Sequence, residues 1–461
     1  MSIIAALKAA VGPDVVLAAD EADLDRHLHD FAYASPPGAR PIGVAYPRST
    51  QEVSTILRLC HAAAQPVTPQ GGRTGLTGAA TPQGRELVLS LERMRAIEAI
   101  DPDAATITVQ AGAILEAVQK AADAAGLFYP LDIGGRGSCT IGGNVSTNAG
   151  GNRVLRYGMT RDLVLGVEGV LADGTIVSSL NKMLKNNTAY DVKQLFIGSE
   201  GTLGVITRVV LRLYPKPLSV CTALVAVSSY GQAMALLARA RAGLGGTLSA
   251  FEAMWPDYFA MGCLQLSRSP PLAQTWPLYV LMDAVGSDQA QDQARLEALI
   301  GQALEDGVVE DAAIAQSERD AKDFWTIRDV SGEMPRLFGP SVGFDVSIPT
   351  GQIADFVADC EVRLAQAAPG SRSVYFGHVA DANLHIAVKV GEGELPSALI
   401  ERTVYGAVRD FAGSVSAEHG IGVSRKAYLA FSRSPEELGL MRAIKHALDP
   451  CGILNPGKVM D

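Results

Sequence analysis

Three glycine-rich loops in the first half of the chain constrain its fold more than any other feature. The loops are PQGGRTGLTGA (69–79), LDIGGRGSCTIGGNVSTNAGGN (131–152) and FIGSEGTLGVIT (196–207), and each lies beside a strand-like segment. Consecutive backbone N–H groups in such loops can form a concave site for an anion. A single glycine loop is usually a plain turn, but three in one domain indicate backbone that closely approaches a phosphate-bearing ligand.

Neither of two common phosphate-binding motifs fits these loops. The first loop has no Lys-Ser/Thr pair after its second glycine, and Val459 follows Gly457–Lys458 where a Walker A loop requires a hydroxyl side chain. None of the three loops has the G-x-G-x-x-G spacing that opens a helix in a Rossmann fold. The sequence therefore predicts a ligand that is not held at a Rossmann turn.

Strand and helix signals alternate around the glycine loops. We expect an amphipathic helix within 1–16, helices at 49–64 and 113–126, strands at 41–47, 65–72, 105–112 and 204–217, and a hairpin at 163–177. Ser49 with Glu52 has the spacing of a capping box. Gly126 is placed to end its helix, and Asp173–Gly174 favours a tight turn in the hairpin.

The chain changes in character after Pro217. Alanine-rich helical segments alternate with strands, and glycine clusters stop until about residue 377. This pattern predicts an antiparallel sheet with flanking helices. A length of 461 residues favours two domains and a small third piece. We expect domains at 1–217 and 218–420, and a segment 421–461 that packs back on the first domain.

Composition excludes several functional classes. The net charge of −10 argues against non-specific nucleic-acid binding, which requires a basic surface. The six cysteines are far apart and form no CxxC pair, which favours reduced thiols in a cytoplasmic protein. No segment has the roughly 18 consecutive apolar residues of a membrane helix. The first residues also lack a signal-peptide cleavage region.

The stretch FGHVADANLHIAV (376–388) contains two of the seven histidines. Alternating apolar residues predict two strands, and ADAN favours a turn between them. A hairpin centred on that turn pairs His378 with His385, and Val379 with Leu384. Directly opposite residues share a face at about 5 Å, so the two imidazoles can hold one metal ion. The alternative is two half-buried histidines in an ordinary hairpin.

The segment SAEHGIG (416–422) places Glu418 beside His419, with Gly413, Gly420 and Gly422 close by. The glycines suit a close approach to a ligand. Two histidines and one carboxylate leave open positions for substrate on Zn²⁺ or Mn²⁺. This segment therefore favours the metal interpretation of the hairpin.

These motifs resemble those of the FAD-dependent D-2-hydroxy acid dehydrogenases, which have the vanillyl-alcohol oxidase/p-cresol methylhydroxylase fold. The resemblance rests on PQGGRTGL, LDIGGRGSCTIGGNVSTNAGG, GSEGTLGVIT and the terminal NPGK, and it covers nearly the whole chain. It implies an α+β protein, with a two-subdomain FAD-binding domain of the p-cresol methylhydroxylase type (PCMH-type) and an antiparallel-sheet substrate (cap) domain with flanking helices. Some relatives attach FAD through a histidine of the first loop. That loop has no histidine here, so we expect non-covalent FAD.

The resemblance also implies which residues contact FAD. By position in the motifs, these are Pro69, Gln70, Gly71, Gly72, Arg73, Thr74, Gly75, Leu76, Asp132, Gly137, Ser138, Cys139, Ile141, Gly142, Gly143, Asn144, Thr147, Asn148, Gly150, Gly151, Glu200, Gly201, Gly204, Ile206 and Asn455.

The histidine motifs carry the implied chemistry. The resemblance makes His378, His385 and Glu418 the ligands of a divalent metal, with Zn²⁺ expected and Mn²⁺ as the alternative. His419 becomes the base near the flavin. A metal on the substrate hydroxyl lowers its pKa by Lewis-acid action, and a histidine can then accept the proton. FAD takes the hydride, and the protein supplies orientation.

Two further residues are implied to contact the substrate, along with the two histidines of the hairpin. Asn383 lies where a family residue approaches the substrate, and Arg328 in DFWTIRD aligns with an arginine that binds the substrate carboxylate. The alternative for Arg328 is an ordinary surface position on a helix.

The chain departs from the hydroxyglutarate branch at two positions. Gly343 stands where a lysine is expected, and Gly332 stands where a threonine is expected. Recognition of a second, distal carboxylate is therefore weakened, which makes a smaller acid such as D-lactate more plausible. Arg336 or Lys322 are candidates to compensate.

The sequence thus predicts oxidation of a D-2-hydroxy acid, of the D-lactate or D-2-hydroxyglutarate class, to the 2-oxo acid. The alternatives are a flavin oxidase of the same fold that uses O₂, and a non-catalytic flavin-binding subunit. Electron-transfer flavoprotein, quinone and cytochrome all remain open as the electron acceptor. The resemblance implies a homodimer.

Overall fold

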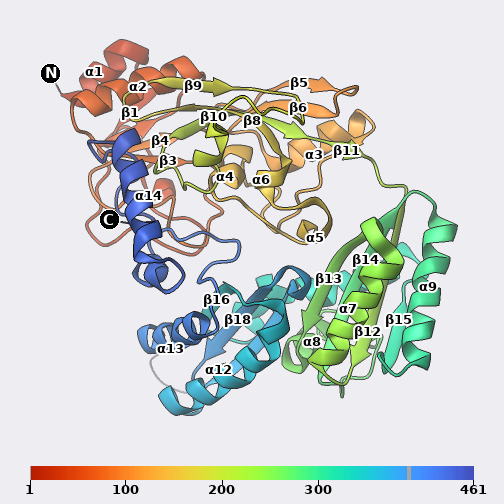
Figure 1. The fold of residues 1–461 in the computed structure, drawn as a ribbon. Helices are drawn as coiled ribbons and strands as arrows, with labels where there is room; N and C mark the ends of the chain where they lie inside the picture. The colour runs from red at the N-terminus through yellow and green to blue at the C-terminus, as the bar shows by residue number, and fades with distance from the viewer. Residues whose placement is uncertain (1, 392–395, 461) are drawn as a thin grey trace. The chain divides into compact units, whose positions relative to one another are not determined.

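The computed structural model describes residues 2–391 and 396–460, and the chain divides into two compact units (Figure 1). The first unit consists of Met1–Gly151, Gly158–Lys216 and Glu418–Asp461, and the second of Asn152–Tyr157 and Pro217–Ala417. Two expected boundaries therefore differ from the structure. The second unit includes a short segment from the first half of the chain, and it ends at Ala417 rather than at residue 420.

The segment Asn152–Tyr157 joins the second unit because of its packing. It contains the short helix α5 (Val154–Tyr157), which lies against strand β13 (Leu248–Met254). The Arg156 guanidinium also donates a hydrogen bond to the carbonyl of Val285. A four-residue helix has no measurable hydrophobic period, so this assignment was not predictable from the sequence.

A four-stranded sheet in the first unit carries the first glycine loop. In spatial order its strands are β1 (Val16–Ala18), β2 (Gly43–Ala45), β4 (Leu87–Ser90) and β3 (Val67–Gln70). The strands expected at 41–47 and 65–72 and the helix expected at 49–64 form a β-α-β unit of β2, α2 (Thr50–Ala62) and β3. Both strands pair with β4 in parallel. Ser49 caps α2 by accepting a hydrogen bond from the Glu52 amide at 3.2 Å. The Glu52 carboxylate accepts from the Arg48 amide instead of the Ser49 amide, so only half of the predicted capping box forms.

A second sheet in this unit is antiparallel. Its strands, in spatial order, are β5 (Ile97–Asp101), β6 (Thr106–Gln110), β10 (Val205–Arg212), β8 (Val164–Val170) and β9 (Ile176–Ser179). The predicted hairpin is confirmed as β8 and β9, and its turn places Gly174 at φ 86°, which favours glycine. The remaining elements of this part are α1 (Ile3–Val11), η1 (Asp25–His27), α3 (Leu115–Ala124), β7 (Leu127–Phe128), α4 (Ile141–Ser146), α6 (Thr160–Leu163), η2 (Val192–Leu195) and β11 (Tyr214–Pro215).

The C-terminal tail packs on the first unit. It contains η7 (Lys426–Phe431) and α14 (Pro435–Leu448), and its last residues run beside β3. The Val67 amide donates to the Ile453 carbonyl, and the Asn455 amide donates to the Val67 carbonyl, each at 2.8 Å. These two bonds hold the NPGK segment next to the first glycine loop.

The second unit is built on a seven-stranded, fully antiparallel sheet, which confirms the expected sheet of the cap domain. In spatial order the strands are β15 (Asp311–Ile314), β12 (Ser219–Val227), β14 (Leu278–Gly286), β13, β17 (Arg372–Gly377), β18 (Asn383–Lys389) and β16 (Val342–Ser347). Its helical elements are α7 (Tyr230–Leu244), η3 (Gly245–Thr247), α8 (Pro256–Cys263), α9 (Gln289–Glu305), α10 (Glu318–Arg328), η4 (Asp329–Glu333), α11 (Met334–Leu337), η5 (Thr350–Gln352), α12 (Ile353–Ala367), η6 (Val379–Asp381) and α13 (Ser397–Asp410).

One core of this unit lies between the sheet and helices α8 and α10. Tyr258 of α8 stacks on Phe376 of β17 with ring centroids 3.9 Å apart, and Phe259 stacks on Tyr279 of β14 at 3.6 Å. Phe324 of α10 is buried in the same cluster. This packing fixes α10, whose last residue is the predicted substrate arginine.

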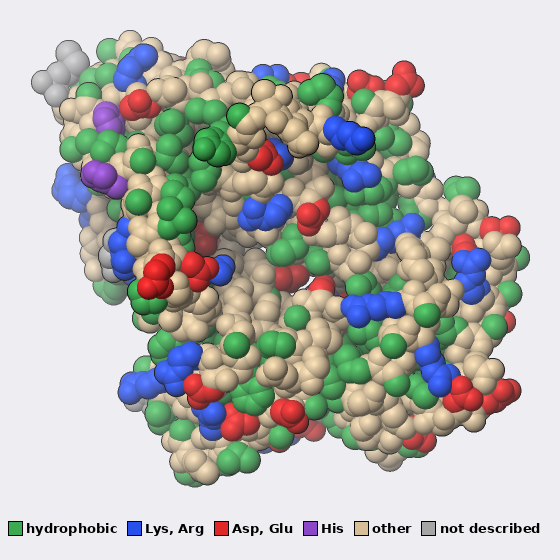
Figure 2. Space-filling model, in the orientation of Figure 1, with side chains coloured by type: hydrophobic (Ala, Val, Ile, Leu, Met, Phe, Trp, Pro, Cys, Tyr) green, Lys and Arg blue, Asp and Glu red, His purple; other side chains and the backbone are tan. Residues whose placement is uncertain are grey.

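The surface carries mixed charge. On the face drawn in Figure 2, Lys and Arg side chains (blue) are interspersed with Asp and Glu side chains (red). The blue side chains form no continuous stripe on this face. Within 2–391 and 396–460, no helix is long and apolar enough to cross a membrane.

Candidate functional site

The three glycine loops come together around one pocket of the first unit. The pocket is lined by Pro69, Gln70, Gly71, Ala79, Ala80, Leu91, Gly142, Gly143, Ser146, Thr147, Glu200, Gly201, Gly204, Val205 and Ile206. Most of these residues belong to the set assigned to FAD by resemblance. Ala79, Ala80, Leu91, Ser146 and Val205 were missed, because apolar and small side chains carry no distinctive chemistry in a sequence.

Close contact between the loops explains their glycines. A Cβ on Gly72 would lie 2.1 Å from the Ser138 carbonyl oxygen, and one on Gly71 would lie 2.3 Å from the Thr140 hydroxyl. A Cβ on Gly142 would lie 2.5 Å from the Cβ of Ala111. The first two loops therefore pack tightly against each other and against Ala111, and a Cβ at any of these glycines would push them apart. The pocket that the three loops line is the glycine cradle.

The other residues assigned to FAD lie in the first two loops, or in the C-terminal tail in the case of Asn455, and do not line this pocket. They are Gly72, Arg73, Thr74, Gly75, Leu76, Asp132, Gly137, Ser138, Cys139, Ile141, Asn144, Asn148, Gly150, Gly151 and Asn455. Cys139, Ile141 and Asn144 are buried, and the Asn144 amide lies 3.6 Å from the Cys139 sulfur. The Asn455 amide group donates to the carbonyls of Ala79 and Glu200, so it ties the tail to the first and third loops.

Glu200 joins the third glycine loop to the segment that follows His419. Its carboxylate accepts hydrogen bonds from the amides of Ile421 at 2.7 Å and Gly422 at 2.8 Å. Burial raises the pKa of Glu200, and the two amide bonds partly oppose that rise. Glu200 therefore has a structural role at the pocket in addition to the one assigned by resemblance.

Glu418 and His419 belong to the first unit. The Glu418 carboxylate accepts a hydrogen bond from the Gly151 amide at 2.6 Å. A Cβ on Gly150 would lie 2.3 Å from the same carboxylate. Nη2 of Arg425 lies 3.3 Å from Nδ1 of His419. Since arginine can only donate, the neutral ring of His419 accepts at Nδ1 and carries its hydrogen on Nε2 in this arrangement.

The predicted register of the histidine hairpin is wrong by two residues. His385 pairs with Phe376 rather than with His378. Strand β17 ends at Gly377, where a Cβ would lie 2.5 Å from the Asn383 carbonyl oxygen, and a 3-10 turn follows with Ala382 at φ 72°. The turn is therefore longer than ADAN suggested. His378 and His385 still lie close together, with ring centroids 5.6 Å apart.

His378 is part of a buried group of charged side chains. Its Nδ1 lies 2.7 Å from Oε1 of Glu252, and Oε2 of Glu252 accepts from Nε of Arg328 at 2.9 Å. Nη2 of Arg328 lies 3.1 Å from Nε2 of His378. All three residues are at most 6 % exposed. Burial alone would raise the pKa of Glu252, but His378 and Arg328 lower it to about 2, so the carboxylate is ionised at neutral pH.

Arg328 is therefore not an ordinary surface residue of its helix. The interpretation of DFWTIRD as an exposed helical segment is wrong at this position, because Arg328 ends α10 inside the unit. The Tyr258 hydroxyl also donates a hydrogen bond to the backbone carbonyl of Arg328 at 2.7 Å.

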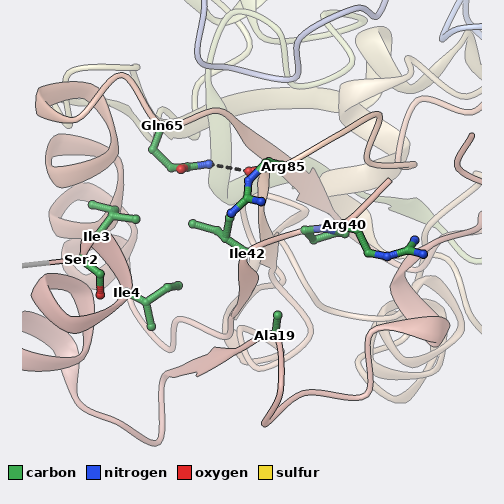
Figure 3. A pocket seen from close by; sticks show the side chains of 9 residues that line it. Ser2, Ile3, Ile4, Ala19, Arg40, Ile42, Gln65 and Arg85 are labelled. Carbon is green, nitrogen blue, oxygen red and sulfur yellow. Dashed lines mark hydrogen bonds between the residues drawn. The ribbon is translucent and has the colours of Figure 1, made fainter. Parts of the chain in front are cut away.

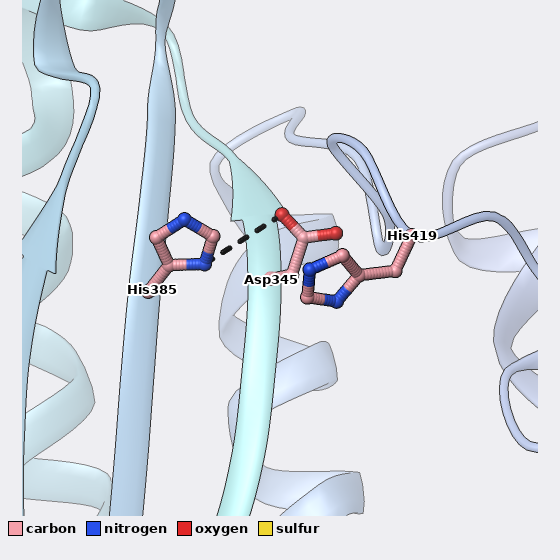
Figure 4. Close-up of side chains that lie close together, drawn as sticks. All are labelled: Asp345, His385 and His419. Carbon is pink, nitrogen blue, oxygen red and sulfur yellow. Dashed lines mark ion pairs between the residues drawn. The ribbon is translucent and has the colours of Figure 1, made fainter. Parts of the chain in front are cut away.

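A second polar group surrounds His385. Nδ1 of His385 lies 3.9 Å from Oδ1 of Asp345 on the neighbouring strand β16 (Figure 4). The same carboxylate oxygen accepts from the Asn383 amide group at 2.7 Å. Asp345 is fully buried, and the buried Oδ1 of Asn383 has no hydrogen-bond partner among the described residues. That oxygen is available to a ligand donor.

Glu252 was not predicted from the sequence, although a single charged residue in an apolar strand is a recognisable pattern. Glu252 is the single charged residue of the apolar strand LSAFEAM, and Asp283 in LYVLMDAVG and Asp345 in VGFDVS show the same pattern. A buried carboxylate in an apolar strand requires partners, so each marks a polar contact on the sheet. Asp283 accepts hydrogen bonds from the Thr222 hydroxyl at 2.6 Å and from the Trp325 indole at 3.0 Å.

The positions that depart from the hydroxyglutarate branch are open. A Cβ on Gly343 or Gly332 would meet no described atom within 4 Å. Arg336, one candidate to compensate, pairs with Glu333 at 2.9 Å and has a side chain that is 62 % exposed. The side chain of Arg336 is therefore held at the surface.

Another pocket of about 430 Å³ lies beside the start of α1 (Figure 3). It is lined by Ser2, Ile3, Ile4, Ala19, Arg40, Pro41, Ile42, Gln65 and Arg85. Both arginines are exposed, and Gln65 donates to the Arg85 carbonyl at 2.8 Å. The pocket contains none of the residues predicted for the site.

Two family models match the chain. Residues 41–179 match the FAD binding domain, and residues 216–459 match the C-terminal domain of FAD linked oxidases. The first match includes the first two glycine loops. The second includes the histidine hairpin, Glu418 and His419.

Curated relatives cover most of the chain. It is 43 % identical over 416 residues to a mitochondrial D-2-hydroxyglutarate dehydrogenase of Bos taurus, a match that spans 90 % of this chain and 76 % of that protein. It is 40 % identical over 455 residues to a D-2-hydroxyglutarate dehydrogenase of Xanthomonas citri pv. viticola, spanning 97 % and 95 %. A putative mitochondrial D-lactate dehydrogenase of Schizosaccharomyces pombe is 36 % identical over 422 residues, spanning 89 % and 80 %.

Solved structures agree on the fold. The chain superposes on p-cresol methylhydroxylase with a TM-score of 0.79 and 17 % identity, over 100 % of this chain and 96 % of that one. Alkyldihydroxyacetonephosphate synthase gives a TM-score of 0.75 and 16 % identity, over 98 % and 85 %. These likenesses confirm the expected α+β fold with a PCMH-type FAD-binding domain. With the family models and the relatives, they show that the chain belongs to the FAD-dependent D-2-hydroxy acid dehydrogenase family.

Proposed function

We propose that the chain oxidises a D-2-hydroxy acid to the 2-oxo acid, with non-covalent FAD in the glycine cradle and a divalent metal on His378, His385 and Glu418. The single observation that carries the proposal is the buried polar group around Arg328 and the two histidines. FAD supplies the hydride acceptor, and the metal, Zn²⁺ or Mn²⁺, supplies a Lewis acid.

The residues present fit both groups. Gly71, Gly142 and Gly143 line the pocket, and the backbone that they leave exposed suits a phosphate-bearing cofactor. Two imidazoles with ring centroids 5.6 Å apart are a donor set typical of zinc sites. Glu418 is proposed as the third ligand from its position in the segment SAEHGIG.

Arg328 is proposed to bind the substrate's C1 carboxylate. Its Nε donates to Glu252, its Nη2 lies 3.1 Å from His378, and its Nη1 lies 3.6 Å from Oδ1 of Asp329. A substrate carboxylate would bind the remaining hydrogens of the two terminal nitrogens. Asn383 is proposed to accept a hydrogen bond from the substrate at its unpartnered Oδ1. These two contacts orient the substrate's C1 end.

His419 is proposed to take the hydroxyl proton. Because Nδ1 accepts from Arg425, the proton must enter at that nitrogen as the Arg425 bond is released. Arg425 is buried, with 5 % of its surface exposed, so it holds the ring in a defined orientation before the substrate arrives.

The distal end of the substrate has fewer specific side-chain contacts than its C1 end. Gly343 lies in β16 two residues before Asp345, so it shares a face of the strand with that residue, and a side chain there would meet open space. We therefore propose that D-lactate-like acids are accepted beside D-2-hydroxyglutarate.

The experiment is a dye-coupled assay with D-lactate and D-2-hydroxyglutarate, before and after EDTA and after Zn²⁺ or Mn²⁺ is restored. The proposal expects activity that EDTA removes and one metal restores. Full activity in metal-free enzyme would contradict the metal assignment, and rapid reoxidation of reduced flavin in air would favour an oxidase. Adding electron-transfer flavoprotein, a quinone or cytochrome in place of the dye identifies the acceptor.

We further propose a homodimer in the cytoplasm. The dimer rests on the family resemblance, and the location rests on six cysteines that form no disulfide. Light scattering of the purified protein tests the first, and fractionation of the source cells tests the second.

A further inference from the structure

One face of the seven-stranded sheet has open space close to the proposed metal ligand His385. Gly343 of β16 lies directly opposite Ala387 of β18, and Asp345 lies opposite His385. Residues paired in this way, and residues two apart on one strand, point to the same face of a sheet. Gly343 is exposed, and a Cβ on it would meet no described atom within 4 Å. A ligand that extends from His385 along this face therefore has room over Gly343.

Lys389 lies on the same face of β18, two residues beyond Ala387. It is the diagonal neighbour of Gly343 across the two strands, and such neighbours are about 7–8 Å apart, within reach of a long side chain. The orientation of Lys389 agrees with this register, because its ammonium contacts Phe338, which belongs to the same buried cluster as Ala387. The Lys389 ammonium can therefore reach the space over Gly343.

The Lys389 ammonium has donors left for a ligand. It donates one hydrogen bond to the Phe338 carbonyl at 2.7 Å and lies 4.4 Å from the centre of the Phe338 ring. A lysine has three N–H donors, so two remain. Among the described residues no carboxylate pairs with Lys389, whereas Arg372, its direct neighbour on β17, is paired with Asp257 at 3.0 Å. Lys389 is also half-buried, and a carboxylate bound there would be attracted more strongly than at an open surface.

Lys389 also has a structural contact, since Phe338 directly follows the last residue of α11. A lysine that donates to a carbonyl at a helix C-terminus stabilises that end of the helix. Such a role uses one donor, and its loss would affect the stability of the protein and the oxidation of every substrate alike. A role toward one class of substrate is therefore separable from it by experiment.

We propose that Lys389 binds the second carboxylate of a dicarboxylic hydroxy acid such as D-2-hydroxyglutarate, with the carbon chain of the substrate over Gly343. This inference rests on the proposed function, in which the substrate's C1 carboxylate lies at Arg328 and its hydroxyl at the metal on His385. A cation of the neighbouring strand then serves the space that a lysine at position 343 would serve. D-lactate has no second carboxylate, so the enzyme accepts it but prefers D-2-hydroxyglutarate.

The test compares kcat/KM for D-2-hydroxyglutarate and for D-lactate in the FAD-loaded enzyme. Lys389→Met keeps the length of the side chain but removes its charge. We expect roughly 10- to 100-fold lower kcat/KM for D-2-hydroxyglutarate, mainly through a higher KM, because a hydrogen bond between charged groups is lost. The kcat/KM for D-lactate should not change.

Two further variants make the comparison specific. Gly343→Lys in the Lys389→Met background should restore the preference for D-2-hydroxyglutarate, because a side chain at Gly343 meets open space on the same face. Arg372→Met is the matched control, since it removes a neighbouring cation that already pairs with Asp257, and it should change neither kcat/KM. If Lys389→Met does not fold, Lys389→Gln takes its place, because glutamine can keep a hydrogen bond to the Phe338 carbonyl.

The outcomes separate the role of Lys389 from the function on which it rests. A wild type that oxidises neither acid would overturn the proposed function and this inference with it. A wild type that oxidises D-2-hydroxyglutarate, with a Lys389→Met protein that loses both activities equally or loses neither, would overturn only the substrate role of Lys389. A selective loss in Lys322→Met or Arg336→Met instead would assign the second carboxylate to that side chain.

Discussion

Replacing Lys458 with methionine should stabilise the FAD-free protein at neutral pH. Lys458 is 2 % exposed, and its ammonium has no hydrogen-bond partner among the described residues. Burial lowers its pKa from 10.5 to about 8, although Glu86 opposes the change. At about 1.4 kcal/mol per pKa unit, burying the charged form costs up to about 3 kcal/mol. Methionine keeps the length of the side chain and removes the charge.

The pH dependence has a definite sign. The unfolded chain keeps the Lys458 proton up to about pH 10.5, whereas the folded chain releases it near pH 8. Between these values the unfolded state binds more protons, so the stability of the wild type rises with pH through this window. The advantage of Lys458→Met should therefore be complete below pH 8 and largely gone near pH 10.5.

Thermal unfolding of FAD-free protein at several pH values measures this effect, because an anionic ligand could pair with the ammonium and hide it. For a chain of 461 residues, about 3 kcal/mol corresponds to an increase in Tm of roughly 3 °C at neutral pH. Lys445→Met is the control with the opposite sign, since Lys445 donates to Asp449 and to the carbonyls of Thr202 and Leu454. A Lys458→Met protein that is no more stable than the wild type at pH 7 would refute the reasoning.

Three further predictions concern the cradle, the cap sheet and the base. Gly72→Ala should lower FAD occupancy, read from the ratio of flavin to protein absorbance, because its Cβ would lie 2.1 Å from the Ser138 carbonyl; Gly134→Ala, which meets no atom within 4 Å, should not. Burial raises the pKa of Asp283 from 3.8 to about 6, so its stabilising contribution is complete below pH 3.8 and is lost as the pH rises through 6. The Trp325 fluorescence should titrate near pH 6 in the wild type and not in Asp283→Asn. His419→Ala should lower the rate of flavin reduction by roughly 10²- to 10⁴-fold with FAD still bound, and unchanged single-turnover kinetics would remove His419 from the base role.

The sequence predicted the features that depend on local patterns. The β8–β9 hairpin followed from Asp173–Gly174, and the course of β3 into the first glycine loop followed from apolar residues that end in Gly71–Gly72. The family was recognisable because the glycine motifs are long and specific. The tail beside β3 was also predictable from NPGK.

Features that depend on tertiary contacts were not predictable. The register at His378 depends on the tight fit of Gly377 against Asn383 and on the left-handed conformation of Ala382, and neither follows from the turn residues ADAN. The partnership of Glu252 with His378 joins residues 126 positions apart through the pairing of β13 with β17. Local sequence carries no information on that pairing.

The central claim is that a D-2-hydroxy acid reduces FAD bound to this chain. The most direct test mixes the purified yellow protein anaerobically with D-2-hydroxyglutarate or D-lactate and follows the visible flavin band, with the L-enantiomers as controls. The account predicts bleaching by the D-acids and little or none by the L-acids, and loss of bleaching when Arg328 is replaced. A correctly folded, FAD-loaded protein whose flavin stays oxidised with every D-2-hydroxy acid would contradict it.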